Sequence, residues 1–350
     1  QALHPEKVVP ASVDITNRKH LVELARGCDV VINEAHAGKL QLLALEAALE
    51  AGAHYIDLGT FHDIMKQQLD LDKEFRKARL TAVLGLGSGP GINNVIARYI
   101  ADKLDSVESV EMSFASTSLT RPSSPLALPY DAGGLWALLT LSPIVFEDGR
   151  FVEKPSFYTL YKNGLLEKSQ FPDPIGICHL GYLPHVEPHT LPIYLANKAV
   201  KSVCVKGAFG ADVLEKFGLL IDIGLTSPDP IMIGGVPVVP QQVLASCVSK
   251  LPGQEAEPIE YGCTRVRVLG EKDGEGVEYT AEMLSGPYRG LNAVQHRTGH
   301  APAIGARMIH RGVINARGVF PPESGVPAEA FLNELKKREL RVSYTCRSYA

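Results

Sequence analysis

Several features that mark special classes of protein are scarce in this sequence. Its 350 residues include only six cysteines, and no two of them are close neighbours, which argues against a disulfide scaffold and against a ribbon-type zinc site. Basic residues number 35 against 39 acidic ones, so no positive excess is available for a nucleic-acid backbone. No run approaches the roughly 20 consecutive apolar residues of a membrane helix. We therefore expect a reduced, cytoplasmic protein without nucleic-acid or membrane partners.

The length and the sequence pattern indicate how the chain is organised. A chain of 350 residues is long enough for two domains, and its 32 glycines and 24 prolines indicate many turns. The alternation of strand and helix patterns in the first part of the chain ends near residue 107. A helical pattern returns towards the end of the chain. We expect a first domain at 1–106, a second at 107–292, and a tail at 293–350 that packs back on the first.

The first hundred residues alternate between strand and helix patterns. Short apolar or β-branched runs, typical of strands buried in a parallel sheet, are each followed by a stretch with helical character. The predicted strands are 8–15, 29–33, 54–57 and 80–85, and the predicted helices are 17–27, 39–51, 63–79 and 93–104. This order is typical of a parallel α/β sheet wound by right-handed crossovers.

The carboxyl ends of the predicted strands carry small, polar or acidic residues. In a parallel sheet, ligands bind beyond this edge. The ends comprise Asp14 and the segments 33–36, 57–60 and 85–91. The pattern favours a binding edge, although the same residue types end strands in proteins that bind nothing there.

The clearest single feature is the glycine-rich segment Gly85-Leu-Gly-Ser-Gly-Pro-Gly-Ile-Asn-Asn94. Its glycines permit positive φ angles and a close approach of a ligand to the backbone. The amides that open the following helix favour an anionic or polar group. The segment does not match Gly-x-Gly-x-x-Gly, and a tight strand-to-helix turn without a ligand is the alternative.

The second part of the chain predicts an α+β domain. Strands are expected at 107–115, 199–207, 261–269 and 276–283, hairpins near 146–151 and 271–274, and a helix at 134–141. In the tail, a helix over 303–310 is expected, with Pro302 in its first turn and Gly312 after its end.

One segment concentrates three histidines and a glutamate in eleven residues. His185, Glu187 and His189 alternate and could lie on one face of an extended segment, with His179 upstream. Three interpretations stay open: a zinc site, a role in substrate binding or proton transfer, and a solvated irregular loop favoured by two prolines. We expect no metal and take His185 and Glu187 as candidate catalytic residues.

Four further residues are candidates for substrate binding. Asp131, after Tyr130, could bind a substrate ammonium, or could simply cap a helix. Arg289 and Arg297 could bind a carboxylate in a bidentate manner, although most arginines are surface residues.

Several motifs, taken together in their order, resemble the saccharopine dehydrogenase family. They are Ser12-Val-Asp14-Ile-Thr16, Asp29-Val-Val-Ile-Asn33, Gly52-Ala-His-Tyr-Ile-Asp57, Gly89-Pro-Gly-Ile-Asn93, Phe146-Glu-Asp-Gly-Arg150, Thr298-Gly-His-Ala-Pro-Ala-Ile304 and Gly312-Val-Ile-Asn-Ala-Arg-Gly318. The resemblance spans nearly the whole chain. It implies a Rossmann domain, an inserted α+β substrate domain, and a C-terminal helix that returns to the Rossmann domain.

The resemblance also implies a cofactor, NAD or NADP, and a position for it. The residues that it places beside the cofactor are Asp14, Asn33, Glu34, Ala35, Asp57, Leu58, Gly59, Gly87, Ser88 and Gly89. A Rossmann domain opens with a β-α-β unit that holds Gly-x-Gly-x-x-Gly and a ribose-binding acid. We expect that unit to precede Gln1, and we expect a homodimer.

The activity that the resemblance implies is hydride transfer between a substrate C–N carbon and the nicotinamide, through an imine, with an amino acid of lysine metabolism as substrate. His185, Glu187 or a water would handle the proton. Two alternatives stay open, namely an enzyme of polyamine synthesis like carboxynorspermidine dehydrogenase, and a binding or regulatory protein of the same fold without catalysis.

Overall fold

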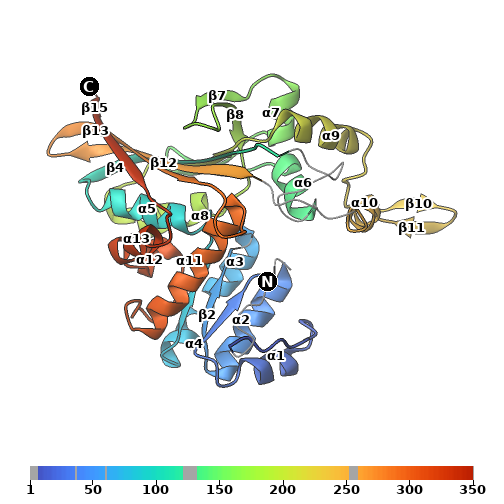
Figure 1. The fold of residues 1–350 in the computed structure, drawn as a ribbon, viewed down its shortest axis with the longest axis horizontal. Coiled ribbons are helices and arrows are strands. Elements are labelled where there is room, and N and C mark those ends of the chain that lie inside the picture. Colours follow the sequence, from blue (N-terminus) through green and yellow to red (C-terminus); the bar gives the residue numbers. More distant parts are fainter. Residues whose placement is uncertain (1–6, 36–37, 60, 121–131, 252–258, 350) are drawn as a thin grey trace.

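The computed structural model describes residues 7–35, 38–59, 61–120, 132–251 and 259–349. A sheet of four parallel strands forms the lower half of the molecule in Figure 1. Across the sheet the strands are β1 (Val30–Asn33), β2 (His54–Asp57), β3 (Thr81–Val83) and β14 (Gly318–Phe320). The predicted parallel sheet is confirmed, and it gains a strand from near the C-terminus.

The crossover helices follow from local sequence signals. They are α1 (Arg18–Ala25), α2 (Lys39–Ala51), α3 (His62–Leu69) and α4 (Asp72–Lys77). The side chain of Asn17 accepts a hydrogen bond from the His20 amide and caps α1. Gly52 ends α2 with a φ of 76°, a backbone conformation that favours glycine.

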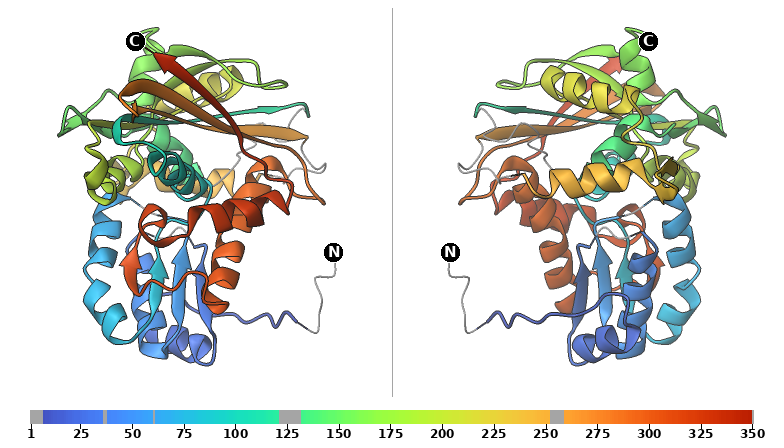
Figure 2. Two further views of the ribbon diagram at one scale, coloured as in Figure 1. Left: turned by 90° about the vertical axis from the view of Figure 1, so that its left-hand side faces the viewer. Right: turned by 90° about the vertical axis from the view of Figure 1, so that its right-hand side faces the viewer.

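The long helix α11 (Ala293–His310) packs against β1 and β2, on the face of the sheet away from α3 and α4 (Figure 2). Gly305 makes this packing close, because a Cβ atom there would overlap the Leu86 side chain and lie 3.0 Å from Cδ1 of Ile56. The predicted return of a C-terminal helix to the first sheet is confirmed.

A mixed sheet of nine strands forms the other half of the molecule. Its path is β15 (Ser343–Tyr349), β13 (Glu275–Ser285), β12 (Glu260–Lys272), β4 (Ser106–Ser118), β9 (Ser202–Gly207), β5 (Ile144–Glu147) and β6 (Arg150–Glu153), with β8 (Ile177–Tyr182) beside β9 and β7 (Glu167–Gln170) beside β8. Helices surround it: α6 (Ala132–Thr140), α7 (Phe157–Lys162), α8 (Glu187–Tyr194), α9 (Ala211–Asp222) and α10 (Pro240–Val248). A small hairpin, β10 (Ile231–Ile233) and β11 (Val236–Val238), projects from this half.

Helix α5 (Ile92–Ala101) joins the two halves. It contacts β4 and β12 on one side and the C-terminal helices α12 (Pro322–Gly325) and α13 (Ala328–Lys336) on the other. Ile92, Val95, Ile96 and Ile100 are fully buried, and they belong to a single apolar cluster with residues of both sheets. The two sheets therefore share one hydrophobic core.

Three details of the predicted elements are wrong. Residues 8–14 form no strand; Pro10 lacks an amide donor, and Val9 is 87% exposed. The predicted helix 63–79 is two helices, because a turn between them lets both Met65 and Phe75 enter one apolar cluster.

The third wrong detail is the start of the tail helix, which begins at Ala293 and not near Pro302. Asn292 and Gln295 form a capping box at its start. Pro302 lies inside this helix, where Ala301 and Ile304 are buried against the core.

None of the helices in the described part of the chain has the length and the hydrophobicity that crossing a bilayer requires.

Candidate active site

The parallel strands bring the predicted binding residues to one edge. Asn33 and Asp57 are the last residues of β1 and β2 and lie opposite each other in the register. The segment after β3 reaches the same edge, where the Leu86 amide donates to the Asp57 carbonyl at 2.7 Å. Of the predicted ends, His36 and Thr60 lie outside the described residues, and Asp14 lies in the exposed segment before α1, bonded to Thr16.

Asp57 holds this edge together. One carboxylate oxygen accepts hydrogen bonds from the amides of Gly59, at 3.0 Å, and Gly85, at 2.7 Å. The other accepts from Gln68, at 2.9 Å, and from the Tyr55 hydroxyl, at 3.3 Å. Burial raises the pKa of Asp57, although these four donors oppose the shift. Its role in this structure is thus to fix the backbone of two loops at the edge.

The glycine-rich segment folds into a closed turn that only glycine fits. The Gly87 amide donates to the Pro90 carbonyl, and the Ile92 amide donates to the Gly87 carbonyl, both at 2.9 Å. Gly91 has a φ of 131°, and a Cβ atom there would overlap the Gly87 carbonyl. Asn94 caps α5 by accepting from the Gly91 amide at 2.8 Å.

Buried polar groups with no hydrogen-bond partner among the described residues lie in and next to this turn. They are the hydroxyl of Ser88 and both side-chain polar atoms of Asn93, which is fully buried. Gly89 lies against the ring of Phe114 on β4, which a Cβ atom would overlap. Because buried polar groups in proteins are normally hydrogen-bonded, these atoms indicate a place for a polar ligand.

His185 and Glu187 form a hydrogen-bonded pair beside Phe114. Nδ1 of His185 lies 3.1 Å and 3.3 Å from the two carboxylate oxygens of Glu187. Glu187 is fully buried, whereas His185 keeps 14% of its side chain exposed. The His185 ring is 5.6 Å from the Phe114 ring. Phe114 therefore contacts both the glycine-rich turn and the candidate acid/base pair.

The expected extended segment with three aligned side chains is wrong, and the irregular loop is confined to residues 183–186. Glu187 opens helix α8, with Pro188 in its first turn, so His189 turns away from His185 and stacks on His62 at 3.7 Å. Burial lowers the pKa of His189 to about 4. His179 lies exposed on β8. Among the described residues, no group of three or more His, Cys, Asp or Glu side chains is placed to hold a metal ion.

The two candidate arginines lie in different places. Arg297 is buried and donates to the Ser285 hydroxyl at 2.9 Å, with its guanidinium over Gly262 of β12. Burial raises the pKa of Glu260, at the start of β12, and the charge of Arg297 opposes the shift. Tyr130 and Asp131 lie outside the described residues.

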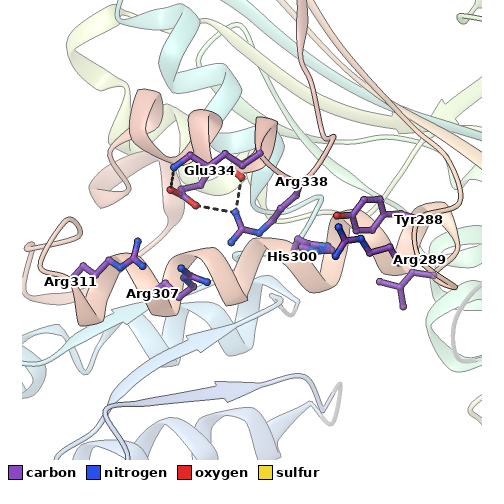
Figure 3. A pocket seen from close by; sticks show the side chains of 9 residues that line it. Tyr288, Arg289, His300, Arg307, Arg311, Glu334 and Arg338 are labelled. Carbon is purple, nitrogen blue, oxygen red and sulfur yellow. Dashed lines mark hydrogen bonds and ion pairs between the residues drawn. The ribbon is translucent and has the colours of Figure 1, made fainter. Parts of the chain in front are cut away.

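Arg289 lines a pocket of about 540 Å³ between α11 and α13. Figure 3 shows Arg307 of α11 and Arg311 at the end of that helix, opposite an ion pair between Glu334 of α13 and Arg338 just after α13, which measures 2.9 Å. None of the residues that line this pocket belongs to the glycine-rich turn or to α8. The structure thus separates Arg289 from His185 and Glu187.

A family model described as the saccharopine dehydrogenase C-terminal domain matches residues 87–340, and one described as the saccharopine dehydrogenase NADP binding domain matches residues 1–83. The chain belongs to the saccharopine dehydrogenase family. The predicted class, an NAD(P)-dependent oxidoreductase, is confirmed at the level of the family.

Two curated relatives resemble this family member along most of its length. Carboxynorspermidine synthase of Vibrio alginolyticus is 23% identical over 319 residues, which cover 84% of this chain and 72% of that protein. Carboxyaminopropylagmatine dehydrogenase of Synechocystis sp. is 24% identical over 358 residues, which cover 94% and 83%. The apo saccharopine dehydrogenase (L-Glu forming) of Saccharomyces cerevisiae shares the fold, with a TM-score of 0.73 at 14% identity, covering 96% of this chain and 89% of that one.

The residues of this saccharopine dehydrogenase family member fit a nicotinamide group at the strand edge. A carboxamide needs hydrogen-bond donors and acceptors, which the unpartnered atoms of Ser88 and Asn93 offer. Gly59 and Gly89 leave no room for side chains of their own, because Pro90 packs against Gly59 and the Phe114 ring packs against Gly89. Phe114 was not among the predicted site residues, because no short motif marks it. Asn93 lies in the motif Gly89-Pro-Gly-Ile-Asn93 but was not predicted as a site residue.

Replacing Asp57 with asparagine is expected to lower the free energy of unfolding by about 1–2 kcal/mol. The amide nitrogen would face the donors of Gln68 and Tyr55, and two of four hydrogen bonds would be lost. Urea denaturation followed by circular dichroism measures this change. Asp70→Asn, at an exposed position after α3, is the matched control and should leave stability unchanged. Equal stability of both variants would contradict the role given to Asp57.

Proposed function

We propose that this chain reduces the C=N bond of an imine formed from an amine and a carbonyl compound, with NAD(P)H as reductant. The observation that carries the proposal is the His185–Glu187 pair, which shares Phe114 with the glycine-rich turn. An acid/base pair next to a polar cofactor cradle is what an imine reduction needs, because the nitrogen takes up a proton as the carbon takes up a hydride.

The residues of the chain would each have a separate role in this reaction. Bound NAD(P)H supplies the hydride. Ser88 and Asn93 would hold the nicotinamide carboxamide, and Asn33, Glu34, Ala35, Asp57, Leu58, Gly59, Gly87 and Gly89 would shape the edge along which the cofactor lies. Phe114 would exclude water on the side of the turn. His185 would carry the proton at Nε2, while Glu187 holds Nδ1 and fixes the tautomer.

Buried charges of the second sheet and of helix α11 support an amine substrate that also carries a carboxylate. Glu260 is buried, and a substrate ammonium would neutralise such a group. Arg297 provides the complementary cation, held by Ser285 and suited to a carboxylate. A carboxylated polyamine has both features, and so does a secondary amine built from two amino acids. The names of the two curated relatives favour the polyamine class over the amino acids of lysine metabolism.

The test is a panel assay that follows absorbance of the reduced nicotinamide. Diamines and α-amino acids serve in turn as the amine, each with small aldehydes and with 2-oxo acids, and with NADH and NADPH. We expect oxidation of the cofactor with diamines, at rates at least tenfold above those with α-amino acids. Turnover with α-amino acids alone would contradict the polyamine class. No turnover with any pair would contradict the reductase and favour a binding protein of the same fold.

A further inference from the structure

The pocket between α11 and α13 is rich in basic side chains. Its volume of about 540 Å³ is in the range of pockets that hold small ligands. Five of its nine lining residues are arginine or lysine and one is acidic, although the whole chain has more acidic than basic residues. The basic ones are Arg289, Arg307, Arg311, Lys337 and Arg338. Positive charge is therefore concentrated here against the overall charge of the chain.

The acidic residue of the pocket, Glu334, is already paired. One of its carboxylate oxygens accepts from Lys337 and the other accepts from Arg338, at 2.9 Å for the Arg338 bond. Arg338 also donates to the backbone carbonyl of Glu334, at 2.7 Å. These bonds hold both basic side chains at the α13 side of the pocket, where Figure 3 shows them facing α11. One carboxylate balances only one of the five positive charges.

Two arginines line the α11 side of the pocket. Arg307 and Arg311 are four residues apart, so their side chains project from the same face of the helix. Both are exposed, and neither forms an ion pair or a side-chain hydrogen bond with a residue that the structure describes. Like charges at this spacing repel each other. An anion bound in the pocket would offset that repulsion.

A tight turn holds Arg289 at the other end of the pocket. The amides of Tyr288 and Leu291 each donate to the carbonyl of the other residue at 2.9 Å, and between them Arg289 and Gly290 have φ angles of 49° and 82°. Glycine or asparagine is usual at the first of two such positions, so arginine there is strained. Its guanidinium lies over the Tyr288 ring, 5.1 Å from the centroid, and that ring stacks on His296 at 4.1 Å. The turn and the stacked rings thus fix the guanidinium at the pocket.

We propose that this pocket binds a chain of linked phosphate groups, either a free polyphosphate or the phosphates of a nucleotide. Guanidinium groups bind phosphate oxygens in a bidentate manner, and the three unpaired ones, of Arg289, Arg307 and Arg311, come from both ends of α11. Linked phosphates reach more of these groups than a single phosphate does. Because His296 and Arg289 already contact the Tyr288 ring, we expect recognition by charge, without stacking of a base.

The test is calorimetric titration of the full chain with tripolyphosphate, ATP, adenosine and citrate at low salt, where charge interactions are least screened. We expect tripolyphosphate and ATP to bind with similar Kd values, adenosine not to bind, and citrate to bind at least about tenfold more weakly. ATP that binds at least tenfold more tightly than tripolyphosphate would identify a nucleotide as the source of the phosphates. Citrate that binds as well as tripolyphosphate would overturn the assignment to phosphate, and so would no binding of either phosphate compound at about 1 mM.

A pair of double variants locates the binding. Arg307→Gln with Arg311→Gln should weaken tripolyphosphate binding at least about tenfold. Lys73→Gln with Lys77→Gln is the matched control, because these exposed lysines have the same spacing on α4, across the sheet from α11. It removes the same charge and should change Kd less than about twofold.

Equal weakening by both double variants would mean that the overall charge of the chain attracts the anion, and would overturn the inference. Displacement of tripolyphosphate by NADPH would also overturn it, because the pocket would then belong to the cofactor site. The binding assay needs no turnover, so its result does not depend on whether the proposed function holds.

Discussion

Replacing His185 with glutamine is expected to lower kcat/KM by about 10²–10³-fold, the usual contribution of a general acid or base. Glutamine has nearly the reach of histidine but cannot hold a titratable proton. KM should change little, because the side chain acts on the reacting proton and not on the bound substrate. Steady-state kinetics in both directions measure the effect, and thermal unfolding shows whether the fold is kept.

His189→Gln is the matched control for this variant. His189 lies two residues after Glu187, stacks on His62, and its pKa of about 4 keeps it uncharged at neutral pH. A side chain that stays neutral cannot supply a proton, so its loss should change kcat/KM less than threefold. A larger loss for the His189 variant than for the His185 variant would reassign the acid/base role.

Local pattern was sufficient to predict most of the first sheet. The apolar runs at β1, β2 and β3 and the caps at Asn17 and Gly52 are features of short segments, and the structure has them where expected. β14 could not be predicted in this way. It has three residues and depends on pairing with β3, more than 230 positions earlier in the chain.

The site shows the same division between local and distant information. That Asn33, Asp57 and the glycine-rich turn share an edge follows from the parallel order of the strands. The proximity of Phe114 to both the turn and His185 depends on how two sheets pack around α5. Glu323 comes from the tail, and only tertiary structure brings its carboxylate to the Asn94 side chain, 2.9 Å away. Sequence reasoning found the residues that local motifs mark and missed those that packing supplies.

Replacing Gly305 with valine is expected to lower the free energy of unfolding by about 3 kcal/mol. A side chain at this position would overlap Leu86 and press on Ile56, so α11 would have to move off the sheet. Leu86 belongs to the glycine-rich segment, and its amide donates to the Asp57 carbonyl. The variant should therefore also weaken cofactor binding, measured by fluorescence titration at a temperature where it remains folded.

Gly299→Ala on the same helix separates this packing effect from helix propensity. No atom lies within 4 Å of a Cβ at Gly299, so alanine there should stabilise the protein by up to about 1 kcal/mol. If Gly305→Val lowers the free energy of unfolding and Gly299→Ala raises it, the position of α11 that tolerates no added side chain is its contact with Ile56 and Leu86. Destabilisation by both would mean that the whole helix tolerates no change, and stabilisation by both would contradict the close packing of Gly305. Weaker cofactor binding in the Gly305 variant alone would link the cofactor edge to the packing of α11 against Leu86 and Ile56.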